Sequence, residues 1–211
     1  TGYLDLRNDT GKLIAKVFFT YYKKDGAEAA KRPICFTFNG GPGSSSVWLH
    51  MGGLGPKRVV LQEDGTATAP PYQVIDNKFS WLDKSDMVFI DPVATGYSKP
   101  APGENAKQFH GFVEDIQSVG SFIRDFLSRY ERWGSPKFLA GESYGTTRAA
   151  GLSKYLQDNY RIFFNGIFLI SPVLNFGTND YYIGNDLPRA LYIPSYTAAA
   201  WYHKKLAPAL Q

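Results

Sequence analysis

The chain has little cysteine, methionine or histidine, with one, two and three of these residues in its 211 positions. The single cysteine, Cys35, cannot form an internal disulfide, which excludes a small disulfide-stapled scaffold. It stands in an apolar run, so we expect a buried and inert thiol. No stretch is long and apolar enough to span a bilayer. No motif for a metal or an organic cofactor is present, and none is expected to bind.

An excess of one charge is also missing. The formal net charge is +4, and the basic residues occur in scattered pairs among acidic ones. A protein that binds nucleic acid usually carries a basic stripe or patch. We therefore expect no nucleic acid among the partners.

Apolar and aromatic residues are plentiful, at 44% and 16% of the chain. This content supports a large core and excludes a disordered chain. Residues 1–24 predict an antiparallel hairpin, since two β-rich runs flank the turn residues 8–11. Short, nearly continuous apolar runs predict strands covered on both faces; they lie at 32–38, 87–90, 138–140 and 166–170.

Helical patterns alternate with these strands. Apolar residues from Phe112 to Trp133 fall on one stripe, which predicts an amphipathic helix with its aromatic residues in the core. Residues 146–160 predict a second helix, and 195–206 a short third one. The alternation predicts an α/β fold with a mostly parallel sheet that starts with the antiparallel hairpin. Composition shifts after about Gly177, which predicts one domain over 1–177 and a different segment over 178–211.

The most informative motif is the sequence from Gly141 to Gly145, which has the form G-x-S-x-G. An apolar strand precedes it and a helical pattern follows it. This context is that of a nucleophile elbow, a sharp turn that exposes a serine hydroxyl at the edge of the sheet. The pattern predicts Ser143 as the nucleophile. A plain turn between a strand and a helix is the alternative.

A glycine-rich loop over 39–46 follows the first buried strand. A phosphate-binding loop would need a lysine followed by serine or threonine, and a dinucleotide fingerprint would need a different glycine spacing. An oxyanion hole needs only exposed backbone N–H groups, and hydrolases keep one after such a strand. The predicted donors are the N–H groups of Gly41 and Tyr144.

Taken together, the motifs 39–46, 55–56, 91–98 and 141–145 resemble those of the serine carboxypeptidases, and they occur in that family's order. These are α/β-hydrolases that remove the C-terminal residue of peptides. The resemblance covers about residues 32–175. The unpaired Cys35 and the shape of segment 47–51 favour a bacterial-type member.

The resemblance implies roles for individual residues. Ser143 matches the nucleophile, and Gly41 and Tyr144 match the oxyanion donors. Peptides with a free C-terminus are then the implied substrates, and export to the periplasm or the outside is the implied location. Residues 178–211 would begin a helical cap insertion in the sheet.

In the family, certain residues hold the terminal carboxylate of the substrate. The residues that match them here are Asn39, Gly40 and Glu142. A protonated glutamic acid can donate a hydrogen bond to a carboxylate, whereas an ionised one would repel it. Without the resemblance, Asn39 could equally stabilise a turn and Glu142 could be a solvated residue. Two positions depart from the family pattern, because Gly53 stands where many members have a second glutamate and Thr37 where they have a tryptophan. We therefore expect fewer side chains to bind the substrate's terminal carboxylate here than in those members; this set of residues is called the carboxylate grip below.

The general base is not evident. In α/β-hydrolases the serine comes first, then the acid, then the histidine. His50 and His110 precede Ser143, and His203 lies in a helical pattern, so each is expected to be structural. Two acids after the fourth strand, Asp180 and Asp186, come too soon to complete the site.

We therefore expect an N-terminal portion of the family's fold, with a sheet incomplete at its C-terminal side. The triad would be completed by residues outside this chain, and the chain alone would be inactive. A second polypeptide or self-association would cover the open sheet edge. Two other functions stay open, namely a carboxypeptidase-like acyltransferase or esterase and a non-catalytic binding fragment.

Overall fold

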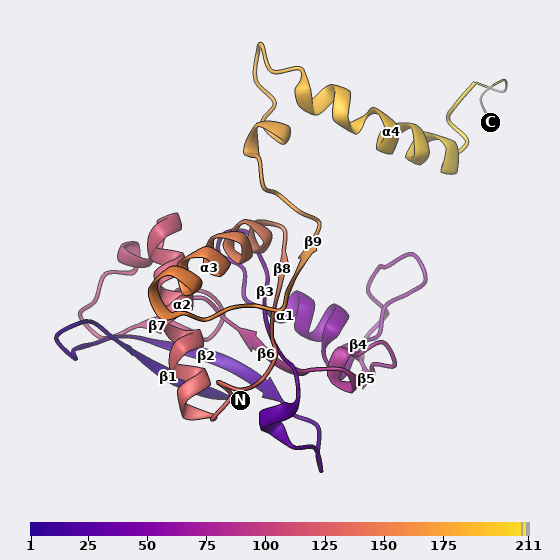
Figure 1. The fold of residues 1–211 in the computed structure, drawn as a ribbon. Coiled ribbons are helices and arrows are strands. Elements are labelled where there is room, and N and C mark those ends of the chain that lie inside the picture. Colours follow the sequence, from indigo (N-terminus) through magenta and orange to yellow (C-terminus); the bar gives the residue numbers. More distant parts are fainter. Residues whose placement is uncertain (208, 210–211) are drawn as a thin grey trace. The chain divides into compact units, whose positions relative to one another are not determined.

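The computed structural model describes residues 1–207 and 209. It divides into two units, Thr1–Pro172 and Val173–Gln211, which are described separately below. Figure 1 traces both along the chain.

The first unit is built on one mixed sheet of seven strands. Its main path runs in the order β1, β2, β6, β3, β8, β9, and β7 pairs with β2. The hairpin strands pair antiparallel, and the four strands β6, β3, β8 and β9 are mutually parallel. The strands are β1 (Gly2–Arg7), β2 (Leu13–Tyr22), β3 (Ile34–Phe38), β6 (Asp86–Ile90), β7 (Lys99–Pro100), β8 (Lys137–Glu142) and β9 (Gly166–Ile170). The predicted α/β fold with an N-terminal antiparallel hairpin is confirmed.

Helices cover this sheet. They are α1 (Val47–Leu49), which continues into one π-helical turn (His50–Leu54), α2 (Phe112–Arg129) and α3 (Tyr144–Tyr160). Three short 3-10 turns lie in the connections, at Ala29–Lys31, Trp81–Asp83 and Ala106–Phe109. A small hairpin of β4 (Lys57–Val59) and β5 (Val74–Asp76) forms a separate two-stranded sheet.

The two faces of the sheet carry different cores because side chains alternate along each strand. On β3 and β6, Phe36, Phe38 and Ile90 join the larger apolar cluster with α2 and α3. Their neighbours Cys35 and Met87 face the other way, into a smaller cluster with α1 and the π-helical turn. Continuous apolar runs in the sequence thus correspond to strands that are buried on both sides.

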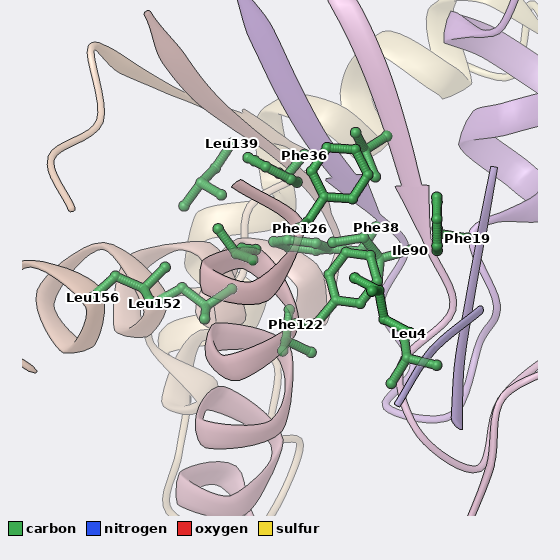
Figure 2. Close-up of a cluster of buried hydrophobic side chains, with 14 of the residues drawn as sticks. Leu4, Phe19, Phe36, Phe38, Ile90, Phe122, Phe126, Leu139, Leu152 and Leu156 are labelled. Carbon is green, nitrogen blue, oxygen red and sulfur yellow. The ribbon is translucent and has the colours of Figure 1, made fainter. Parts of the chain in front are cut away.

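The larger cluster is a layer of aromatic and aliphatic side chains between the sheet and two helices. Figure 2 shows Phe122 and Phe126 of α2 directed at the strand residues Phe19, Phe36 and Phe38. The Phe126 ring meets the rings of Phe19 and Phe36 edge to face, with centroids 5.5 Å apart in both pairs. This contact fixes α2 against the middle of the sheet, and α3 packs beside it through Leu152 and Leu156.

The structure corrects the predicted extent of α2. The helix ends at Arg129, and Trp133 lies beyond it with 45% of its surface exposed. Phe112 and Val113 in the first turn are also exposed, at 47% and 57%. The buried part of the stripe therefore runs from Ile116 to Leu127, and the two predicted ends of the stripe are exposed.

Strand β9 differs from the other parallel strands. Among the described residues it pairs only with β8, and Ile167, Phe168 and Leu169 are each about 40% exposed. The predicted burial on both faces is thus not found for this strand. Its outer edge presents unpaired backbone groups.

The second unit holds a 3-10 turn (Phe176–Thr178) and α4 (Leu187–Tyr202). Helix α4 begins eight residues before the predicted short helix. Pro188 lies in its first turn, where a missing N–H removes no helical hydrogen bond. Pro194 lies inside the helix, which continues on both sides of it.

Candidate active site

Ser143 stands in a strained backbone conformation between β8 and α3. Its φ and ψ angles are 56° and −125°, in a region that residues with a side chain rarely adopt. The serine N–H donates to the carbonyl of Ile170 at 3.0 Å, and its carbonyl accepts from the N–H of Thr146. The turn is tight enough that a Cβ on Gly141 would stand 2.1 Å from the Gly145 carbonyl oxygen. The G-x-S-x-G sequence therefore forms an elbow that requires its glycines.

The glycine-rich loop approaches this elbow at Gly40. A Cβ on Gly40 would lie 2.5 Å from the backbone nitrogen of Tyr144. That nitrogen starts a helix, so it has no intrahelical acceptor. Gly41 follows with a φ of +109° and is exposed. A side chain on Gly40 would therefore collide with the backbone at the start of α3, so only glycine lets the loop pass this close to the Tyr144 N–H.

The parallel register brings Asn39 beside Glu142. Phe38 on β3 pairs with Gly141 on β8, so Asn39, which follows β3, comes beside Glu142, the last residue of β8. The Asn39 Nδ2 donates to Glu142 Oε2 at 3.0 Å, and the Asn39 Oδ1 accepts from the N–H of Leu49 at 3.0 Å. This second bond fixes which way the amide faces. Asn39 is buried and Glu142 is half-buried.

A buried ion pair lies beneath the elbow. Arg148 on α3 donates from Nε to Asp115 Oδ2 at 2.8 Å, and both residues are buried. The hydroxyl of Tyr144 donates to the same carboxylate oxygen at 3.2 Å. Burial and the nearby Asp115 raise the pKa of Tyr144 to about 12, so its hydroxyl stays protonated and remains a donor.

The glycine-rich loop is braced by Asp91 after β6. This carboxylate accepts from the N–H groups of Ser46 at 2.9 Å and Tyr97 at 3.2 Å. Burial raises the pKa of Asp91, and the two N–H donors oppose that rise. A Cβ on Gly96 would stand 2.0 Å from the carboxylate, so the 91–98 turn is shaped around it. This motif supports the loop.

A cavity of about 270 Å³ opens next to the loop and the elbow. Its lining includes Pro42 and Gly43 of the loop, Val93, Phe109, and Tyr144 and Arg148 of α3. Its size suits one side chain of a substrate. Tyr144 of the elbow lines this cavity.

None of the three histidines hydrogen bonds to Ser143 within residues 1–207 and 209. His50 bonds to the Tyr22 hydroxyl at 2.8 Å and stacks on Phe89, and burial lowers its pKa. His110 ends the 3-10 turn before α2 and borders the cavity. His203 follows α4 in the second unit. The structural roles expected for the three histidines stay predictions.

The chain is similar to proteins of one known family. Residues 1–206 match the family model described as serine carboxypeptidase. The chain belongs to the serine carboxypeptidase family. Its closer assignment to a bacterial-type member stays a prediction.

Two relatives illustrate the similarity to serine carboxypeptidases. Serine carboxypeptidase-like 33 of Arabidopsis thaliana is 27% identical over 166 residues, which are 77% of this chain and 32% of that protein. The pheromone-processing carboxypeptidase KEX1 of Saccharomyces cerevisiae is 33% identical over 134 residues, 60% of this chain and 17% of that protein. The chain thus spans a third or less of these relatives.

A solved structure shares the serine carboxypeptidase fold seen here. The crystal structure of KEX1, a prohormone-processing carboxypeptidase from Saccharomyces cerevisiae, has a TM-score of 0.68 and 21% identity. The similarity covers 98% of this chain and 42% of that one. It supports the α/β-hydrolase arrangement of the sheet.

The predicted site residues of the first unit lie together at the carboxyl ends of β3 and β8. Sequence reasoning missed Arg148 and Asp115. A signal was present, since Arg148 stands on the otherwise small and apolar stripe of α3 that holds Ala149 and Leu152. A charged residue at such a position indicates a specific buried partner.

Two further findings concern ligands and membranes. Within the described residues, no group of three or more histidine, cysteine, aspartate or glutamate side chains is arranged to hold a metal ion. None of the described helices is both long and apolar enough to cross a membrane.

Proposed function

We propose that the chain carries the nucleophile and substrate-carboxylate part of a serine carboxypeptidase, which removes C-terminal residues of peptides through an acyl-enzyme. The hydrogen bond between Asn39 and Glu142, next to the strained Ser143, is the observation that supports it. It joins two polar groups at the edge of the nucleophile elbow. One N–H of the Asn39 side chain donates to Oε2 of Glu142. The other carboxyl oxygen of Glu142 is left to contact the substrate.

The chemistry follows from this arrangement. The Ser143 Oγ attacks the carbonyl carbon of the last peptide bond while its proton passes to a general base. The C–N bond then breaks, and the base gives its proton to the departing amine, which leaves as the C-terminal amino acid. Water attacks the acyl ester in the same way and restores the serine. The N–H groups of Gly41 and Tyr144 stabilise the negative oxygen of each tetrahedral intermediate.

The terminal carboxylate of the peptide is held by Asn39, by the backbone of Gly40 and by Glu142 in its protonated form. A carboxylate accepts hydrogen bonds only, so each of these groups must donate. Glu142 is half-buried and already accepts from Asn39, which leaves its second oxygen free to carry the proton. This grip would restrict cleavage to the chain end.

The general base and its acid partner are proposed to lie outside these 211 residues. The supporting observation is that the His50 ring bonds to the Tyr22 hydroxyl and that, within the described first unit, no hydrogen bond joins His50 or His110 to Ser143. A further polypeptide or a second copy is proposed to pair with the outer edge of β9, where apolar side chains are exposed. Residues 178–211 are proposed to begin a cap insertion, and export remains the proposed location.

The decisive experiment uses the complete enzyme with a blocked dipeptide as a free acid, as an amide and as an ester. A fluorophosphonate should label Ser143, and Ser143→Ala should lose at least four orders of magnitude in turnover. The free acid should be cleaved far better than the amide. Equal cleavage of both would reject the carboxylate grip, and preference for simple esters would favour an esterase or acyltransferase.

A further inference from the structure

Arg148 makes contacts that join the two segments of the predicted oxyanion site. It is 1% exposed. Its Nη1 donates to the backbone carbonyl of Asn39 at 2.8 Å, and its Nε donates to Asp115 at 2.8 Å. The guanidinium carbon lies 5.1 Å from the ring centroid of Tyr144 and 5.2 Å from that of Phe38.

Through these contacts, the Arg148 side chain connects the two segments that carry the predicted oxyanion donors, the N–H groups of Gly41 and Tyr144. The Asn39 carbonyl belongs to the peptide that leads into Gly40 and Gly41, so its bond to Arg148 holds the start of the loop. The side chain of Tyr144 is fixed as well. The Arg148 guanidinium lies over its ring, and its hydroxyl donates to Asp115. A planar guanidinium can bond along its edge and stack on its face at once.

Stability alone does not explain this arrangement. Replacing a buried ion pair by apolar residues of similar volume is often neutral or stabilising, because two charges must be removed from water. The neighbouring positions of α3 on the same stripe are filled by alanine and leucine. An arginine here is therefore better explained by the geometry that it imposes on its neighbours.

We propose that Arg148, oriented by Asp115, is a positioning residue that sets the relative placement of the Gly41 and Tyr144 N–H groups. It touches neither substrate nor the reacting atoms. The proposal rests on the proposed function, in which these two N–H groups stabilise the oxyanion. Displacing them lowers the stabilisation of the tetrahedral intermediate more than it weakens the binding of the ground-state peptide, whose carboxylate is held mainly by the Asn39 and Glu142 side chains.

The test compares Arg148→Lys with Arg132→Lys in the complete enzyme. Arg132 is the matched control, since it is also fully buried and paired with an aspartate, Asp86, but lies at the opposite ends of the strands. Lysine keeps the charge but cannot bond and stack in two directions at once. Asp115→Asn is the second variant, because it keeps Arg148 while removing the charge that orients it.

The readouts separate positioning from general damage. For Arg148→Lys we expect kcat to fall by about tenfold to a hundredfold, less than the loss of a whole oxyanion donor, with KM changed by less than about threefold. The affinity for a peptidyl boronic acid, which forms a tetrahedral adduct on Ser143, should fall by a similar factor. Asp115→Asn should show the same pattern more weakly, and Arg132→Lys should keep kcat per folded molecule.

The outcomes are distinct. If folded Arg148→Lys keeps kcat and boronate affinity, or if Arg132→Lys loses as much, the positioning role is rejected. If Arg148→Lys does not fold, an unchanged kcat in Asp115→Asn rejects it instead. The rate of fluorophosphonate labelling does not depend on peptide cleavage. Labelling of Ser143 without peptidase activity would reject the proposed function alone, while the labelling rates of the variants would still test Arg148.

Discussion

The side-chain amide of Asn39 donates to the carboxyl of Glu142 at 3.0 Å, although 103 positions separate the two residues in the chain. The parallel register of β3 and β8 produces this contact, because Phe38 and Gly141 are direct partners. The Leu49 N–H holds the amide from the other side. Asn39 therefore links the glycine-rich loop, the end of α1 and the nucleophile elbow.

The carboxylate grip predicts a selective effect on substrates. Asn39→Ala in the complete enzyme should raise KM for a free-acid dipeptide by about tenfold or more, since a hydrogen bond to a charged group contributes about 1.5–3 kcal/mol. Glu142→Gln should raise it less, because the amide remains a donor. Steady-state kinetics on the free acid and the matched ester measure both effects. An equal change on the two substrates would contradict the grip.

The elbow predicts a steric effect at Gly141. Gly141→Ala places a Cβ 2.1 Å from the Gly145 carbonyl oxygen, so the turn must open and Ser143 must move. We expect fluorophosphonate labelling of Ser143 in the complete enzyme to be lost. Gly52→Ala is the control, since a Cβ there has open space around it. Normal labelling of Gly141→Ala would show that the elbow relaxes without harm.

The buried Asp86 predicts a large stability effect away from the site. It accepts from Arg132 at 2.7 Å, from Arg32 at 2.6 Å and from the N–H of Lys24 at 3.1 Å. Asp86→Ala leaves the Arg132 charge buried without its partner, which costs about 3–5 kcal/mol. Urea unfolding measures the loss. Lys154→Gln, which breaks an exposed pair with Asp158, should change the midpoint little.

His50 predicts a dependence of stability on pH. Burial lowers its pKa below the ordinary value of 6.5 in the folded chain. As pH falls through 6.5, the unfolded chain takes up a proton before the folded one does, so stability decreases with falling pH until the folded pKa is reached. His50→Phe should remove this part of the decrease. Thermal melts of both proteins between pH 7.5 and 5, about the range over which histidine titrates, would show parallel curves if His50 does not contribute.

We expect the 211-residue chain by itself to have no carboxypeptidase activity. Without a general base it should show no carboxypeptidase turnover on a blocked dipeptide at mildly acidic pH, since removing that base costs several orders of magnitude in rate. The exposed edge of β9 should make it self-associate. Activity assays and size-exclusion chromatography with light scattering test both points. Turnover by a clean monomer would mean that a histidine of this chain acts as the base.

The sequence alone determined the elements whose signals are local. Glycines at 141 and 145 permit a turn that other residues would block, and apolar runs identify strands with two covered faces. The positions of Ser143, the glycine-rich loop and α3 could therefore be predicted. The end of α2 and the start of α4 could not, since the apolar stripe continues past Arg129 and Pro188 is tolerated in the first turn of α4.

Only the tertiary structure decided which distant groups meet. The pairing of Asn39 with Glu142 depends on strand register, and the joining of Arg148 to Asp115 depends on how α2 and α3 lie against each other. The local sequence can show that Arg148 stands on an apolar stripe of α3, but it does not show which residue is its partner. A buried charge or amide must find a partner, but the fold, rather than the chain near it, determines which one it finds.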